Sequence, residues 1–81
     1  MSITPDQCRA ARAILNWSQG ALSEAAGVAR ATIAEFEGGR RAPISNNLLA
    51  IRTALEQAGV IFLDAGATVD GGPGVRLATK E

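Results

Sequence analysis

The residues best suited to binding a charged partner lie in the stretch GVARATIAEFEGGRR, residues 27–41. Its three arginines, Arg30, Arg40 and Arg41, can each donate paired hydrogen bonds to a phosphate or to the edge of a guanine base. Two glutamates in the same stretch would repel a polyanion unless they have other roles. The whole chain carries eight Lys and Arg and eight Asp and Glu, a formal net charge of zero. Only the distribution of these charges can therefore favour a polyanionic partner.

The residue types present argue against catalysis. The chain has no histidine, so neither a zinc site nor a Ser-His-Asp triad is available. Its single cysteine, Cys8, excludes an internal disulfide and is expected to pack as a small apolar residue. We predict no enzyme activity, no cofactor and no metal. No apolar run reaches membrane-spanning length and the N-terminus lacks a signal-peptide core, so we expect a cytoplasmic protein without a membrane partner.

Four helices are predicted in the first 59 residues from capping residues and from apolar residues at helical spacing. Thr4 precedes Pro5, a combination typical of a helix start, and Ser18 and Ser45 are the other N-cap candidates. Gly27, which is free to take a positive φ, ends the second helix. The predicted helices cover about residues 5–15, 19–26, 29–37 and 46–58.

The hydrophobic period changes after the last helix. The run VIFLD, residues 60–64, is rich in β-branched and aromatic side chains, and VRLAT, residues 75–79, alternates with period two. The Gly-rich connection between them is no phosphate loop, because no lysine follows it and no helix opens there. We predict a two-stranded β-arm.

The second and third helices, joined by a tight turn at Gly27, describe a helix-turn-helix. Small Ala25 and Ala26 allow the two helices to cross closely, and Val28 and Ile33 would fix the angle between them. On this geometry alone, a corner of two helices in any small helical domain remains an alternative.

A set of residues within RAILNWSQGALSEAAGVARATIAEFEGGRRAP resembles the phage-repressor/Cro-like (XRE) family of helix-turn-helix transcriptional regulators. The resemblance covers roughly residues 4–59. The fold expected is mainly α, with a four-helix Cro/phage-repressor-like helix-turn-helix domain over residues 1–59 and a C-terminal two-stranded β-arm over residues 60–81. The matching residues are Arg12, the pair Ser18-Gln19, Leu22, Ala26-Gly27-Val28, Thr32-Ile33, and Glu37 two residues before Gly39.

The resemblance implies that the second helix of the motif enters the DNA major groove with its N-terminal end. Ala29, Arg30, Ala31 and Glu35 would then face the bases. Arg30 could bond guanine O6 and N7 together, whereas the two alanines could only touch a thymine methyl group. Glu35 could accept a hydrogen bond from cytosine N4; alternatively, it is a solvated helix charge.

The resemblance also implies contacts with DNA phosphates. Gln19 begins a helix and would reach a phosphate, although it could instead cap only its own helix. Arg40 and Arg41 match the basic loop that lies along the DNA backbone. The expected phosphate-binding residues are Gln19, Thr32, Arg40, Arg41, Ser45, Asn46 and Asn47.

In this family the equivalent of Glu37 pairs with an arginine of the first helix, and Arg12 stands at the matching place. The resemblance therefore implies a partly buried, structural Arg12–Glu37 ion pair. Without Glu37, the proposed DNA-binding face holds three arginines against one glutamate, so it is basic although the chain is neutral.

With so few cations, a monomer should bind DNA weakly. We expect a homodimer that binds two half-sites of a palindromic operator, about 34–36 Å apart. A lone hairpin is marginal in water, so its edge would pair with the arm of a second subunit. The alternative is an arm folded on its own monomer, with Ile61 and Leu63 packed inside. The expected dimerisation residues are Ile61, Phe62, Leu63, Val75 and Leu77.

The predicted function is sequence-specific binding of double-stranded DNA by a dimeric transcriptional regulator, most simply a repressor. The alternative is an antitoxin or anti-activator whose main role is to bind a protein partner. The neutral chain, Glu35 and the alanines of the reading helix favour this alternative somewhat.

Overall fold

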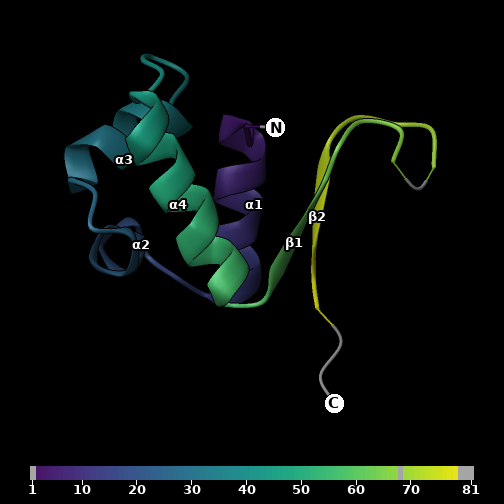
Figure 1. Ribbon diagram of the computed structural model, residues 1–81, viewed down its shortest axis with the longest axis horizontal. Helices are drawn as coiled ribbons and strands as arrows, with labels where there is room; N and C mark the ends of the chain where they lie inside the picture. Colours follow the sequence, from purple (N-terminus) through teal and green to yellow (C-terminus); the bar gives the residue numbers. More distant parts are fainter. Residues whose placement is uncertain (1, 68, 79–81) are drawn as a thin grey trace.

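The computed structural model describes residues 2–67 and 69–78, which form four helices followed by an antiparallel hairpin (Figure 1). This arrangement confirms the predicted fold class. No described helix has the length and apolar character needed to cross a membrane. The elements are α1 (Pro5–Leu15), α2 (Gln19–Ala26), α3 (Arg30–Glu37), α4 (Ser45–Gln57), β1 (Val60–Leu63) and β2 (Gly74–Leu77).

Local hydrogen bonds start the first two helices where the sequence predicts. The Thr4 hydroxyl accepts from the Gln7 backbone N–H, and the Gln7 side chain accepts in return from the Thr4 N–H. This capping box satisfies two N–H groups at the start of α1 that have no partner within the helix. The Ser18 hydroxyl accepts from the Ala21 N–H and caps α2, without a reciprocal bond because residue 21 is an alanine.

Two predicted helix starts are displaced by one residue. Ser45 is not an N-cap but the first residue of α4, because the Ile44 carbonyl already accepts the first helical hydrogen bond, from Leu48 N–H. Likewise, Ala29 precedes α3, and its carbonyl accepts the bonds that open that helix. Neither Ile44 nor Ala29 provides a side-chain cap.

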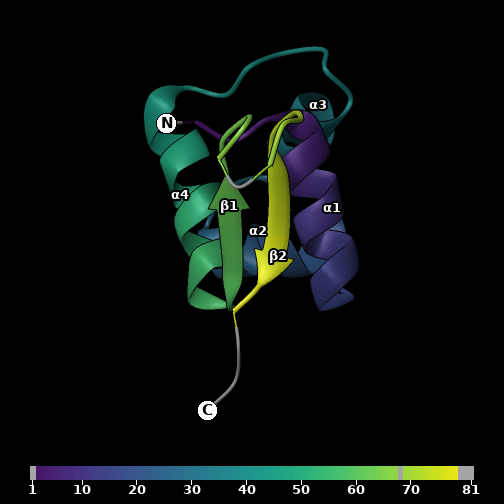
Figure 2. The same ribbon diagram turned by 90° about the vertical axis from the view of Figure 1, so that its right-hand side faces the viewer.

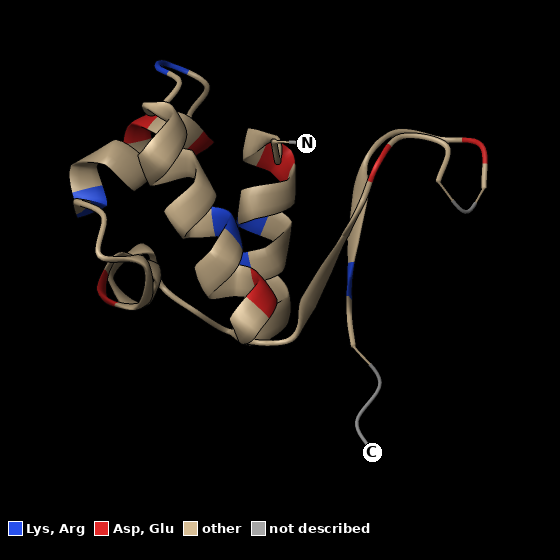
Figure 3. Ribbon diagram, in the orientation of Figure 1, with Lys and Arg blue, Asp and Glu red and all other residues tan. Residues whose placement is uncertain are grey.

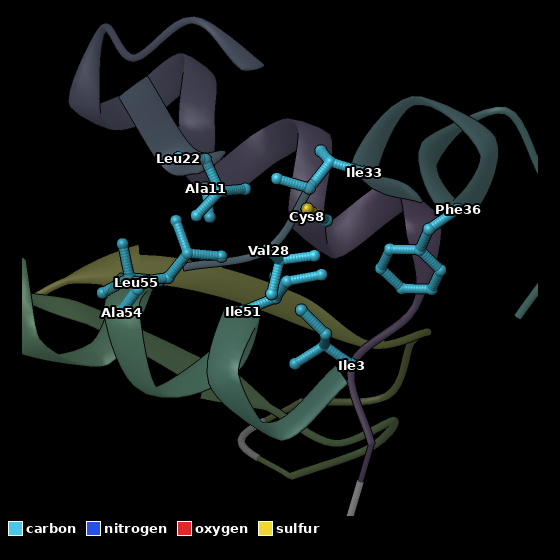
Figure 4. Packing of buried hydrophobic residues seen from close by; sticks show 11 residues of the cluster. Ile3, Cys8, Ala11, Leu22, Val28, Ile33, Phe36, Ile51, Ala54 and Leu55 are labelled. Carbon is cyan, nitrogen blue, oxygen red and sulfur yellow. The ribbon is translucent and has the colours of Figure 1, made fainter. Parts of the chain in front are cut away.

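The core is a single cluster to which all four helices and β1 contribute (Figure 4). Cys8 is fully buried within it, as expected for a small packing residue. The cluster joins the turn between α2 and α3 to α1 and α4, so the helix-turn-helix does not stand alone. Its members among the described residues are Ile3, Cys8, Ala11, Leu22, Val28, Ile33, Phe36, Ile51, Ala54, Leu55 and Val60.

The hairpin lies against α1 and α4, on the side of the molecule away from α3 (Figure 1). Val60, the first residue of β1, is buried, and period two therefore turns Phe62 and its cross-strand neighbour Val75 toward the core. Ile61 points the other way and is 38% exposed. The arm thus packs on the helices of its own subunit. The face that packs carries Phe62 and Val75, whereas the alternative of an arm folded on its own monomer had placed Ile61 and Leu63 inside.

The strand bounds differ slightly from the predicted runs. β1 ends before Asp64, and β2 begins one residue before Val75. The end of the second predicted run, at Thr79, lies outside the described residues.

Candidate nucleic-acid interface

A left-handed glycine, local hydrogen bonds and buried side chains fix the geometry of the turn between α2 and α3. Gly27 ends α2 with a φ of 68°, a left-handed conformation that suits glycine. The Ser23 hydroxyl then donates to the Val28 carbonyl at 2.6 Å, and the Ser23 carbonyl accepts from the N–H groups of Gly27 and Val28. With Val28 and Ile33 buried beneath this turn, α3 is held at a fixed angle to α2.

The surface of α3 divides cleanly into a buried and an open side. Ile33, Phe36 and Glu37 face the interior. The residues predicted to contact DNA all lie on the open or partly open surface of the molecule. Ala29, Arg30, Ala31, Arg40, Arg41, Ser45 and Asn46 are exposed, and Gln19, Thr32, Glu35 and Asn47 are half-buried.

Basic segments lie at the start of α3 and in the loop between α3 and α4, on the side of the molecule away from the hairpin (Figure 3). Between this loop and α3 is a pocket of about 190 Å³. Its lining brings the predicted base-contacting Glu35 together with three predicted phosphate-binding residues, Thr32, Arg41 and Asn47. The start of α4, which has no side-chain cap, adds its backbone N–H groups to this region.

Arg12 and Glu37 lie in contact, deep between α1 and α3. The Arg12 Nε and Nη2 atoms donate to the two Glu37 carboxylate oxygens at 2.7 Å each, and the Glu37 side chain is only 3% exposed. The remaining acceptor capacity is used by the Gln19 side-chain amide at 3.0 Å and the Cys8 thiol at 3.1 Å. Four donated hydrogen bonds therefore satisfy a carboxylate that burial would otherwise penalise.

The pKa values of the network follow from these contacts. Burial alone would raise the pKa of Glu37, but hydrogen bonds from Arg12, Gln19 and Cys8 outweigh it and hold that pKa below its usual range. Burial, reinforced by the hydrogen bond to Glu37, raises the pKa of the Cys8 thiol. The thiol is therefore a neutral donor and no nucleophile at pH 7.

The same network ties α1 to both helices of the motif. The Arg12 Nη1 atom donates to the Trp17 carbonyl at 3.0 Å, just before α2. Arg9 donates to the backbone carbonyl of Glu37 at the end of α3 and also pairs with Asp6. Arginines of α1 therefore hold the start of α2 and the end of α3 against α1.

Gln19 has a role that was not expected from the sequence. Its side chain does not cap its own helix, because the amide donates one hydrogen to the Glu37 carboxylate. The second amide hydrogen and the backbone N–H at the start of α2 remain for a phosphate. No sequence signal identifies this contact, because it joins residues 18 positions apart.

A family model described as helix-turn-helix (HTH_3) matches residues 9–57. The chain belongs to this helix-turn-helix family. Membership in the XRE type of DNA-binding transcription regulators is thereby confirmed. A search of curated proteins gave no significant match. The matched segment contains every residue predicted to contact DNA, and it ends before the hairpin.

Substitution of Glu35 tests whether its carboxylate lies close enough to DNA to weaken binding. Glu35→Gln should strengthen binding to random-sequence DNA about two- to fivefold, because one repulsion between a carboxylate and nearby phosphates is removed. Fluorescence anisotropy at low salt would measure the change. Asp64→Asn removes the same charge from the start of the hairpin loop and should leave the affinity unchanged. Equal effects of the two substitutions would mean that Glu35 does not face DNA.

Proposed function

We propose that the chain is a cytoplasmic, dimeric repressor that reads a palindromic operator with the N-terminal end of α3. The observation that supports this most directly is the exposed Arg30 at that end, together with the basic segments that Figure 3 shows at the start of α3 and in the following loop, away from the hairpin. Glu37 is buried and neutralised by Arg12, so its charge does not oppose DNA. Three exposed arginines then outweigh Glu35 on this face.

The position of the hairpin supports a dimer formed edge to edge. Among the described residues β1 and β2 pair only with each other, so each strand has an outer edge of unpaired backbone groups. Figure 2 shows the flat face of the hairpin turned to the viewer, with the helices behind it. Antiparallel pairing of one edge with the same edge of a second copy places the two-fold axis perpendicular to the sheet.

This axis has a useful consequence for DNA binding. Both helical cores then lie on the same side of a four-stranded sheet. The two copies of α3 lie beyond these cores, so both are presented on one side of the dimer. Stacking the outer faces of two hairpins would instead direct the two α3 helices away from each other. Edge pairing is therefore the arrangement that suits two half-sites on one face of a DNA duplex.

Repression needs only occupancy of a promoter, so it is the simplest outcome of such binding. Selection of bound sequences from a random DNA pool tests the proposal. We expect inverted repeats whose half-sites lie about one helical turn apart. Enrichment of single half-sites would refute the dimer, and enrichment of no sequence would refute specific binding.

The basic loop should dominate the salt dependence of binding. Replacing both Arg40 and Arg41 with alanine removes two phosphate contacts per subunit, which should lower the slope of log K against log salt by roughly 2 per subunit. Titrations at several salt concentrations would measure this slope. A variant with lysine at both positions keeps the charge and should retain a slope near that of the wild type. An unchanged slope in the double alanine variant would place this loop away from DNA.

A protein partner is the second candidate. Ile61, which points away from the core on the outer face of the hairpin, is 38% exposed. An apolar partner could bind there without competing with DNA. Recovery of one stoichiometric protein, with no DNA retained at low salt, would favour an antitoxin or anti-activator over a repressor.

A further inference from the structure

A buried glutamine connects the helix-turn-helix domain to the hairpin. Gln7 on α1 is only 5% exposed, although its side chain is polar. Its Nε2 atom donates to the Leu63 carbonyl at 3.1 Å and to the Gly74 carbonyl at 2.9 Å. These two carbonyls belong to directly opposed residues of β1 and β2. One side-chain amide therefore bridges both strands.

The opposite end of the same side chain is also engaged. The Gln7 Oε1 atom accepts from the Thr4 N–H at 2.9 Å, within the capping box of α1. Both polar atoms of the side chain are thus bonded, and the orientation of the amide is determined by its partners. A buried side chain with both ends bonded makes a rigid connection between α1 and the hairpin.

The hydrogen bonds of Gln7 lie where they can fix the angle between the hairpin and the helices. At one end the arm continues from α4 through Gly59, whose φ of 107° is open to few other residues. The pair Leu63–Gly74 lies at the other end of the ladder, beside the connecting loop. Between these points Phe62 and Val75 pack against the core, and the Arg52 guanidinium of α4 lies 5.5 Å from the centre of the Phe62 ring. The hydrogen bonds from Gln7 tie the loop end of both strands to α1 and so oppose rotation about Gly59.

We propose that Gln7 is a positioning residue that sets the distance between the two reading helices of the dimer. This inference rests on the proposed function, because it requires subunits joined through their arms. The hairpin lies at one end of a molecule that measures 33 Å along its longest axis, and α3 lies toward the other. A rotation of about 10° between arm and core would displace α3 by a few ångströms in each subunit, and the two-fold axis doubles the change in their separation, so the change is comparable with the rise of about 3.4 Å per base pair. Holding the arm at one angle therefore selects one half-site spacing.

The test uses Gln7→Glu with Thr4→Ala as its control. Glutamate has nearly the same shape and keeps the acceptor for Thr4 N–H, but it directs an oxygen at the two strand carbonyls. Thr4→Ala removes the hydroxyl of the capping box and leaves the bridge to the strands intact. Gln7→Met, which removes the donors without adding a charge, serves if the glutamate variant does not fold.

The measurement is affinity for paired half-sites, taken from the wild-type selection, whose separation is varied one base pair at a time. For the wild type we expect one preferred separation. In Gln7→Glu the preference over neighbouring separations should fall about tenfold, the factor expected when hydrogen bonds of ordinary strength no longer hold the arm. Affinity for a single half-site should stay unchanged, and Thr4→Ala should keep the wild-type preference. An unchanged preference in Gln7→Glu would overturn the proposal, as would an equal loss in both variants.

Amide hydrogen exchange separates this inference from the proposed function. Exchange in β1 and β2 should be faster in Gln7→Glu than in Thr4→Ala, with α2 and α3 equally protected in both. If the wild type binds no paired half-sites, the dimeric repressor and the spacing role both fail, whatever the exchange shows. If it binds them and exchange in the strands is unaltered by Gln7→Glu, only the role of Gln7 fails.

Discussion

Glu37→Gln should lower the free energy of unfolding by about 3–5 kcal/mol, the largest effect expected of any single substitution here. The change removes the negative charge that Arg12 faces at 2.7 Å, while the guanidinium remains largely buried with a side chain only 19% exposed. It also replaces an oxygen that accepts hydrogen bonds with an amide that must donate. Urea denaturation at pH 7 would measure the loss.

Glu35→Gln is the matched control, because it makes the same chemical change on the same helix at a more open position. It should alter the free energy of unfolding by no more than about 0.5 kcal/mol. A Glu37→Gln protein as stable as Glu35→Gln would show that the buried ion pair contributes little to stability.

The stability difference between wild type and Glu37→Gln should depend on pH. The pKa of Glu37 is lowered in the folded state, so the folded state binds its proton less readily than the unfolded chain does. The stabilisation is therefore fully present above the ordinary glutamate pKa of about 4.3 and is lost as the pH falls through the lowered folded value. Denaturation curves of both proteins at pH 7 and at decreasing acid pH should converge. A difference that grows on acidification would contradict the lowered pKa.

Arg30→Ala should reduce discrimination at one base pair of the operator by about 1–3 kcal/mol. Arg30 is exposed at the first position of α3, and both residues beside it are alanines without hydrogen-bonding side chains. The reading end of α3 therefore depends on this one guanidinium for paired hydrogen bonds to a base. Competition between the operator and single-base variants would measure the discrimination at each position.

Arg30→Lys distinguishes the contribution of the positive charge to DNA binding from that of the planar guanidinium group. Lysine keeps the positive charge, so affinity for random DNA and its salt dependence should stay close to those of the wild type. It lacks the planar fork, so the guanine preference should weaken at the same base pair as in Arg30→Ala. If neither variant changes discrimination at any position, the proposed orientation of α3 on DNA is wrong.

The sequence by itself determined the local structure and the family. The starts of α1 and α2 follow from Thr4 and Ser18, because a capping hydroxyl bonds an N–H only two or three residues away. Gly27 marks the turn for a similar reason, since a left-handed residue ends a helix wherever it occurs. Helical spacing and the residue set of the motif then led to the family that the comparison confirms.

Only the tertiary structure decided how distant residues meet. VIFL is apolar on both faces, so nothing in its pattern selects Phe62 over Ile61 for the core until the end of α4 fixes the direction of Val60. The bridge from Gln7 to the two strands spans 56 and 67 residues, and Cys8 reaches Glu37 across 29. Such contacts depend on how complete elements pack, and the short-range periodicities of a sequence identify the buried face of each element but not the distant element that covers it.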